Sequence, residues 1–177
     1  MPEITKRKIV AQSRIFTIEQ LDLRFSNGVQ VQYERLCPRG QGAVLIVPLL
    51  DDDTVLLIRE YAAGVERYEL ALPKGKIDAN ETVEEAANRE LAEEVGYAAH
   101  SLQRLKSLSA SPGYLANNTH VVLATQLYEK RLPGDEPEPI EVVPWKLSEL
   151  EQLLRHPECT EARTIAALFM VKYHQPA

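Results

Sequence analysis

Six carboxylates crowd the stretch from Glu81 to Glu94, and the only basic residue among them is Arg89. On a helix Glu90 and Glu94 share one face, and Glu93 lies close to that face. Like charges at this spacing destabilise a helix, and acids near its C-terminus oppose its dipole. Two carboxylates about 4 Å apart repel by about 4 kcal/mol at an effective dielectric of about 20. A divalent cation relieves that repulsion, and oxygen-only ligands favour Mg²⁺ or Mn²⁺ over zinc.

A run of glutamates on a helix is ordinarily a solvated face, but the spacing of the surrounding residues favours a functional site. The pattern comprises Gly75, Glu81, Arg89, Glu90, Leu91, Glu93, Glu94, Gly96 and Tyr97. It resembles the Nudix box of the Nudix hydrolase family. Only Tyr97 departs, at a packing position where that family prefers an aliphatic residue. The resemblance therefore implies a metal-dependent hydrolase that cuts pyrophosphate bridges.

The resemblance also implies which residues bind the metal. Glu90 and Glu94 are expected as the main ligands of Mg²⁺ or Mn²⁺, and Glu93 as a ligand of a further ion with a catalytic role. The backbone carbonyl of Lys74 resembles a metal ligand of ADP-ribose hydrolases in this family. These ions would neutralise the phosphate oxygens and lower the pKa of a bound water.

Four other residues of the box have expected roles in holding this site together. Arg89 is expected to pair with Glu81 and so to orient the helix and the preceding loop around the catalytic centre. Gly75 is expected to open that loop. Gly96 lies where a helix favours a residue of positive φ as its end.

The reaction also needs a group that takes a proton from the attacking water. In ADP-ribose-type relatives this group is a glutamate on a late loop outside the box. The only acidic late loop here is formed by residues 134–139. Glu136 is the first choice for the base, Glu138 the second and Glu141 the third, and the alternative for each is a solvated loop residue.

Three residues outside the box concern the substrate. Pro112 lies sixteen residues after Gly96, a spacing that resembles the ADP-ribose pyrophosphatase subgroup. Tyr114 lies near the tyrosine associated with dinucleoside polyphosphate hydrolases, although both residues also suit a turn between strands. Arg59 is a candidate contact for the substrate phosphates, and its alternative is a surface arginine at a strand end.

The stretches outside the box resemble those members of the family that hydrolyse ADP compounds. The matching residues are 25–29, 58–62, 74–75, 77–78, 85–91, 134–139, 161–163 and 167–169. The resemblance implies hydrolysis of ADP-ribose, NADH and diadenosine triphosphate with release of AMP. It also implies a homodimer in which an N-terminal sheet packs across the partner.

Two other functions remain open. The first is the same chemistry on another nucleoside diphosphate compound, such as a nucleotide sugar or a capped RNA. The second is a non-catalytic nucleotide-sensing module on the same fold, although such modules usually lose a glutamate of the box. The net charge of −6 and the lack of a basic stripe argue against a nucleic-acid partner.

The elements that must position these residues are predicted from local patterns. Apolar alternation over residues 14–25 and 29–33 around Asn27-Gly28 predicts a hairpin that residues 37–40 break. Residues 43–50 and 54–59 are short buried strands joined by an acidic turn, and further strands are expected at 69–72, 102–108, 119–127 and 142–145. Thr82 and Glu85 form a capping-box pattern that begins a helix over 82–95. Further helices are expected at 147–154 and 161–173.

These elements predict an α/β fold, and the resemblance implies an α/β/α sandwich with a mixed sheet. We expect residues 1–40 to form an N-terminal antiparallel region that mediates dimerisation, and residues 41–177 to form the hydrolase domain. Neither Cys37 nor Cys159 has metal-ligand spacing, which favours two free thiols. The absence of a signal peptide and of a long apolar run predicts a cytoplasmic protein without a membrane partner.

Overall fold

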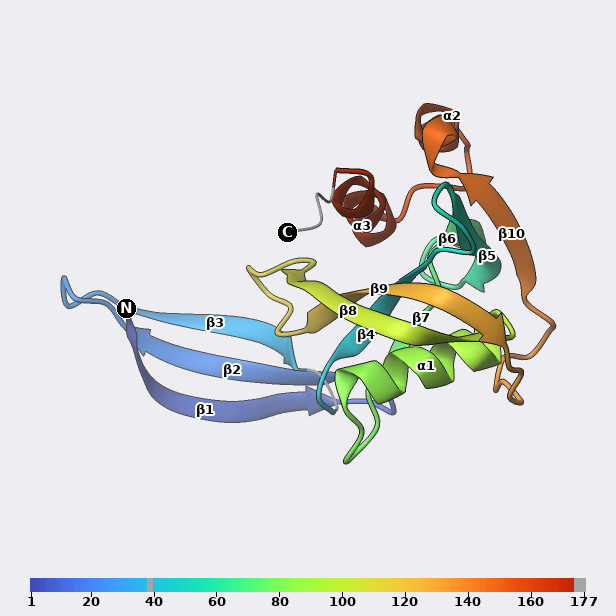
Figure 1. The fold of residues 1–177 in the computed structure, drawn as a ribbon. Coiled ribbons are helices and arrows are strands. Elements are labelled where there is room, and N and C mark those ends of the chain that lie inside the picture. The colour runs from blue at the N-terminus through green and yellow to red at the C-terminus, as the bar shows by residue number, and fades with distance from the viewer. Residues whose placement is uncertain (38–39, 174–177) are drawn as a thin grey trace.

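The computed structural model describes residues 1–37 and 40–173 and contains three sheets and three α-helices in that part of the chain (Figure 1). One sheet has the order β1-β2-β3, the second β10-β5-β6 and the third β7-β4-β9-β8. The strands are β1 Glu3–Gln12, β2 Thr17–Arg24, β3 Gln30–Cys37, β4 Ala43–Pro48, β5 Thr54–Ala62, β6 Arg67–Ala71, β7 Lys74–Lys76, β8 Tyr97–Ser109, β9 Asn118–Glu129 and β10 Glu141–Lys146. The helices are α1 Val83–Glu94, α2 Leu150–Leu154, which follows a 3₁₀ turn at Leu147–Glu149, and α3 Ala162–Lys172.

The N-terminal sheet is an antiparallel meander that extends away from the rest of the molecule (Figure 1). The predicted hairpin is present, because Gly28 adopts φ +84° and the Phe25 N–H donates to the Val29 carbonyl. The sequence patterns did not reveal β1, because all ten of its residues are exposed and no buried face imposes an alternation. The predicted break lies partly outside the described residues, at Pro38 and Arg39.

The two apolar strands β4 and β5 are joined by the expected acidic turn but belong to different sheets. Asp51 accepts hydrogen bonds from the backbone N–H groups of Asp53 and Thr54, and an isolated bridge joins Leu49, just after β4, to Val55. Strand β4 lies between β7 and β9, and its pairing with β9 is parallel. A strand buried on both faces carries apolar residues continuously, which is why β4 lacks alternation.

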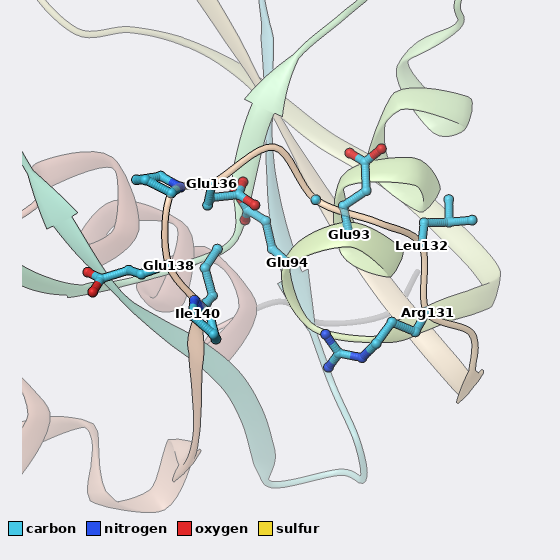
Figure 2. Close-up of a pocket in the computed structure, with 10 residues that line it drawn as sticks. Glu93, Glu94, Arg131, Leu132, Glu136, Glu138 and Ile140 are labelled. Carbon is cyan, nitrogen blue, oxygen red and sulfur yellow. The ribbon is translucent and has the colours of Figure 1, made fainter.

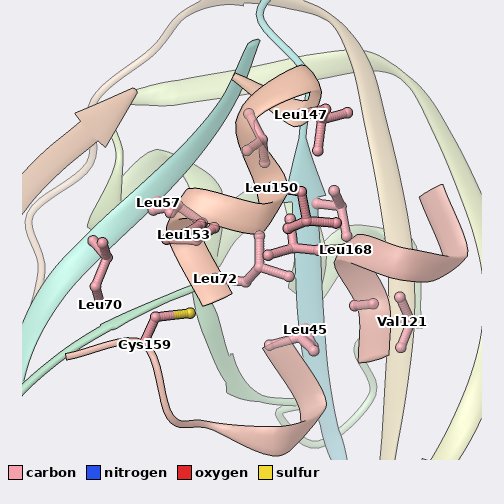
Figure 3. Packing of buried hydrophobic residues seen from close by; sticks show 13 residues of the cluster. Leu45, Leu57, Leu70, Leu72, Val121, Leu147, Leu150, Leu153, Cys159 and Leu168 are labelled. Carbon is pink, nitrogen blue, oxygen red and sulfur yellow. The ribbon is translucent and has the colours of Figure 1, made fainter. Parts of the chain in front are cut away.

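Helices cover both faces of the two sheets that contain β4 and β5, so the fold is the expected α/β/α sandwich. Helix α1 packs on one side, where the core comprises Val44, Ile46, Leu56, Ile58, Ala86, Ala87, Leu91, Val95 and Val122. Helices α2 and α3 pack on the other side (Figure 3), where the core comprises Leu45, Val47, Leu57, Leu72, Val121, Leu150, Leu153, Cys159 and Leu168. No helix of the described residues is long and apolar enough to cross a bilayer.

Candidate active site

Helix α1 brings the predicted carboxylates to its C-terminal half. The helix begins at the predicted capping box, in which Thr82 and Glu85 bond each other's backbone, and it is followed by Gly96 at φ +85°. Glu90 and Glu94 face the strands and are only 8% and 4% exposed, while Glu93 is half-buried. The two main candidate ligands are therefore not on a solvated face.

Gly75 provides the space into which the Glu90 carboxylate fits. A Cβ atom at Gly75 would lie 1.9 Å from the Glu90 carboxyl carbon and 2.0 and 2.1 Å from its oxygens. Gly75 lies in β7 and pairs with Val44 of β4. Its neighbour Lys74 donates its backbone N–H to a Glu94 oxygen at 2.9 Å. The backbone of β7 therefore approaches both buried carboxylates, and a side chain at position 75 would displace the Glu90 carboxylate from its present place.

Arg89 ties α1 to the loop that precedes it. Its guanidinium donates to both oxygens of Glu81 at 2.9 and 3.0 Å and to the Lys76 carbonyl at 2.8 Å. The remaining nitrogen donates to Glu90 at 2.8 Å and to Glu93 at 2.9 Å. The hydrogen bonds to Glu81 contribute most to raising the pKa of Arg89, and Arg89 in turn lowers the pKa of Glu81. The arginine thus carries a permanent positive charge into the acidic cluster.

Burial controls the protonation of the two innermost acids. It raises the pKa of Glu90 to about 7 and that of Glu94 to about 8, against the opposing effects of Arg89 and Lys74 respectively. Neighbouring carboxylates act in the same direction, because Glu90 raises the pKa of Glu94 and Glu93 raises that of Glu90. The pair therefore favours the binding of positive charge, either protons or a cation.

The residues at this site fit a hard divalent cation. Their side-chain donors are all carboxylate oxygens, which suit Mg²⁺ or Mn²⁺, and the absence of a side chain at Gly75 admits one of these carboxylates. Among the described residues, however, no three His, Cys, Asp or Glu side chains are already grouped for coordination. The reason is that Arg89 holds Glu90 and Glu93, while the Lys74 N–H holds Glu94. Metal binding must therefore turn these carboxylates away from their present partners.

The late acidic loop lies against the C-terminal half of α1 (Figure 2). Glu136 lines the same cleft as Glu90, Glu93 and Glu94, while Figure 2 shows Glu138 pointing away from Glu93 and Glu94. Glu138 instead accepts a hydrogen bond from the Tyr68 hydroxyl at 2.6 Å. Glu141 begins β10, and its ion-pair partner at 3.9 Å is Arg59. The fold thus brings only the first of the three candidate bases to the acidic cluster.

A cleft of about 570 Å³ joins these elements and exposes the candidate residues. It is lined by Glu60, Lys74, Gly75, Lys76, Asp78, Arg89, Glu90, Glu93, Glu94 and residues 133–136. Glu60 was not singled out in the sequence, yet it accepts a hydrogen bond from the Lys74 ammonium at 2.7 Å. Tyr68 was missed as well. No local signal marks either residue, because each meets the site only through the pairing of β5 and β6 and the path of the late loop.

Arg59 lies beside the late loop and is already paired. It donates two hydrogen bonds of 2.8 Å to Glu158, which raise its pKa, and its guanidinium stacks 4.3 Å from the centre of the Tyr68 ring. A small cavity of about 90 Å³ connects Arg59 with Glu60, Tyr61 and residues 136–140. Arg59 can therefore meet a substrate near this loop only in competition with Glu158.

Pro112 and Tyr114 lie at the other end of the molecule. Strand β8 begins directly after Gly96 and runs for 13 residues before their loop, a separation of about 40 Å at the usual rise of about 3.3 Å per residue. The loop is bound to β3, because the Leu36 N–H donates to the Tyr114 carbonyl and the Ala116 N–H donates to the Leu36 carbonyl. It borders a cavity of about 340 Å³ with the side chains of Leu21, Leu23, Phe25 and Tyr33. Within one chain these residues do not meet the carboxylates.

Comparisons with known proteins match this arrangement over nearly the whole chain. The model of the NudE-type Nudix hydrolase N-terminal domain matches residues 2–35, and that of the NUDIX domain matches residues 40–169. The ADP compounds hydrolase NudE of Escherichia coli is 51% identical over 97% of this chain and 91% of its own length. The ADP-ribose pyrophosphatase of Bacillus subtilis is 29% identical over 92% and 91%. A crystal structure of an ADP compounds hydrolase superposes with a TM-score of 0.88 at 50% identity, over 97% and 92% of the two chains.

Proposed function

The chain belongs to the Nudix hydrolase family, and we propose that it hydrolyses the pyrophosphate bond of ADP-X compounds with release of AMP. ADP-ribose, NADH and diadenosine triphosphate are the proposed substrates. The observation that carries the proposal is the pair of buried carboxylates Glu90 and Glu94 at one end of α1, in a chain similar throughout to an ADP compounds hydrolase.

Proteins of this family generally need divalent metal ions, and we propose Mg²⁺ or Mn²⁺ here. Glu90 and Glu94 would hold the ion together with the Lys74 carbonyl, and Glu93 would contribute to a further ion. A bound divalent cation supplies Lewis-acid stabilisation of the phosphate oxygens and activates water. The all-oxygen donor set and the buried position of Glu90 and Glu94 support this assignment.

The chain's own residues orient the substrate and move the proton. Arg89 fixes the loop that contains Lys76 and Glu81 against α1. Glu136 takes the proton of the water that attacks phosphorus, because it is the late-loop glutamate beside the acidic cluster. The P–O bond to the leaving group then breaks, giving AMP and the second phosphate product.

The substrate-binding role of Pro112 and Tyr114 requires a second copy of the chain. We propose a homodimer in which residues 1–40 pack across the partner, so that this loop reaches the partner's cleft. Exposed apolar side chains on the N-terminal sheet support it, namely Ile4, Ile9, Val10, Ile15, Phe16, Val29 and Tyr33. Light scattering during size-exclusion chromatography tests the dimer, and a single-chain mass contradicts it. Residues 41–177 would carry the hydrolase activity, and the proposed location is the cytoplasm.

A substrate panel ranked by kcat/KM tests the proposed function directly. The panel contains ADP-ribose, NADH, diadenosine triphosphate, a nucleotide sugar and a capped RNA, each with Mg²⁺ or Mn²⁺. We expect the first three to yield AMP most efficiently. Preference for the nucleotide sugar or the RNA replaces the proposed substrate class. Absence of turnover on the whole panel, with retained nucleotide binding, favours a sensing module instead.

A further inference from the structure

The loop of residues 132–140 reaches the acidic cluster with few attachments of its own. At its start the Leu132 N–H donates to the Ala92 carbonyl of α1 at 3.0 Å, and at its end Ile140 packs against the core beneath α1. Between these ends, one hydrogen bond joins the loop to the rest of the described chain, from the Tyr68 hydroxyl to Glu138. Glu138 itself is exposed, so burial does not hold it in place.

Tyr68 is a firm point of attachment because its ring is held from two sides. It pairs across β5 and β6 with Tyr61, and the two rings meet edge to face at 5.6 Å. The Arg59 guanidinium stacks against the ring and is itself bound by two hydrogen bonds to Glu158. The phenol oxygen is therefore fixed relative to the sheet.

The chain between Glu138 and Glu136 transmits this attachment. Both glutamates precede a proline, Pro139 and Pro137 respectively, so neither adopts helical backbone angles readily. Each proline also fixes its own φ near −65°. Because the segment is stiff, holding the Glu138 carboxylate restricts where the Glu136 carboxylate can lie.

Glu136 lies among carboxylates of like charge, since it lines the same cleft as Glu90, Glu93 and Glu94. Gly134 makes room for the half-buried Glu136, because a Cβ atom at position 134 would lie 2.3 Å from a Glu136 oxygen. Repulsion among these like charges favours displacement of the loop, and the contact between Tyr68 and Glu138 opposes it from outside the cluster.

We propose that Tyr68 is a positioning residue for hydrolysis, which anchors the late loop through Glu138 and so holds Glu136 at the acidic cluster. Tyr68 lies outside the Nudix box and touches neither the carboxylates of α1 nor the cleft that they line. The inference rests on the proposed function, in which Glu136 accepts the proton from water.

The test compares Tyr68→Phe with the unmodified protein in hydrolysis of ADP-ribose with Mg²⁺. The substitution keeps the ring packing and removes only the hydroxyl that binds Glu138. We expect kcat to fall about tenfold, the effect of losing one hydrogen bond to a charged group, with KM changed less than about threefold. The midpoint of thermal unfolding should not move. A kcat within about twofold of the unmodified protein overturns the proposal.

Variants of Glu138 separate positioning from a merely structural effect. Glu138→Ala should lower kcat as Tyr68→Phe does, and the double variant should be no slower than either single variant. Glu138→Gln keeps an oxygen that accepts from the phenol, so it should retain most of the activity. The matched control is Tyr61→Phe, because the Tyr61 hydroxyl makes no hydrogen bond with the described residues. Losses that multiply in the double variant contradict the anchor.

A second measurement does not depend on catalysis. Endoproteinase Asp-N cuts before Asp135, within the loop, and mass spectrometry identifies the fragment. Cleavage should be faster in Tyr68→Phe and in Glu138→Ala than in the unmodified protein or in Tyr61→Phe. Equal cleavage rates in all four proteins overturn the proposed anchoring of the loop by Tyr68, even if hydrolysis is normal. If instead the unmodified protein hydrolyses nothing, the proposed function fails while the cleavage rates still decide the anchor.

Discussion

The two ends of strand β8 differ in whether the candidate residues near them form a complete site within one chain. At the end near α1 the candidate residues contact one another. Arg89 has four hydrogen-bond partners, and Gly75 makes room for the buried carboxylate of Glu90. At the other end, Tyr114 is 59% exposed and faces a cavity between its loop and the N-terminal sheet. The candidate catalytic residues thus meet within one chain, whereas the candidate substrate residues lie far from them and reach a cleft only in the proposed dimer.

The largest effect is expected when a buried carboxylate at the α1 end of β8 loses its charge. Glu94→Gln should lower kcat by several orders of magnitude, because the site loses a charged metal ligand while the side chain keeps its shape. Steady-state kinetics with ADP-ribose and Mg²⁺ measures the effect. Glu84→Gln is the matched control, since Glu84 lies exposed on the same helix. Normal activity of Glu94→Gln contradicts the metal assignment.

The next effect concerns the late loop. Glu136→Gln should lower kcat by about 10²- to 10⁴-fold, the usual contribution of a general base, as measured by steady-state kinetics with ADP-ribose and Mg²⁺. Glu141→Gln should leave kcat nearly unchanged, because Glu141 faces Arg59 rather than the cluster. The opposite ranking of these two variants assigns the base to Glu141 instead.

Substitution at the other end of β8 should change binding rather than chemistry. Tyr114→Ala should raise KM about tenfold through the loss of an aromatic contact, with kcat largely retained. Ala substitution of Tyr173, which is also exposed but lies beyond α3, is the control. A fall in kcat without a change in KM places Tyr114 in the chemistry and removes the contrast between the two ends.

The smallest effect is a dependence of stability on pH at the buried end alone. The pKa values of Glu90 and Glu94 in the folded chain, about 7 and about 8, lie above the ordinary 4.5. Between the ordinary pKa and the raised pKa of each group, the folded state therefore binds more protons than the unfolded state. The resulting contribution to stability is present at low pH and is lost as the pH rises through the raised pKa values. Thermal unfolding in EDTA should shift down by several degrees from about pH 5 to about pH 8.

Mg²⁺ should reduce that slope, because it replaces the protons at the two carboxylates. Glu94→Gln in EDTA should flatten the slope as well, since the residue with the larger pKa shift no longer titrates. A slope that stays the same in this variant shows that other groups control the pH dependence of stability.

The sequence by itself determined which candidate residues share helix α1 and where that helix begins and ends. Thr82 and Glu85 cap its start, Gly96 follows its end, and Glu90 and Glu94 lie on one face, because capping and helical period depend only on neighbours along the chain. It also indicated the Arg89–Glu81 pair, but only through the resemblance to a family. The sequence did not predict the exposed strand β1, because a strand without a buried face has no alternation of apolar and polar residues.

The tertiary structure alone decided which late glutamate meets the cluster and how far away Pro112 and Tyr114 lie. Those outcomes depend on contacts between residues remote in sequence, such as Tyr68 with Glu138 and Leu36 with the loop before β9. Local spacing is the same for any path of the loop, so it cannot rank Glu136, Glu138 and Glu141. The path is set by strand pairing and packing, which act only once the sheets have formed.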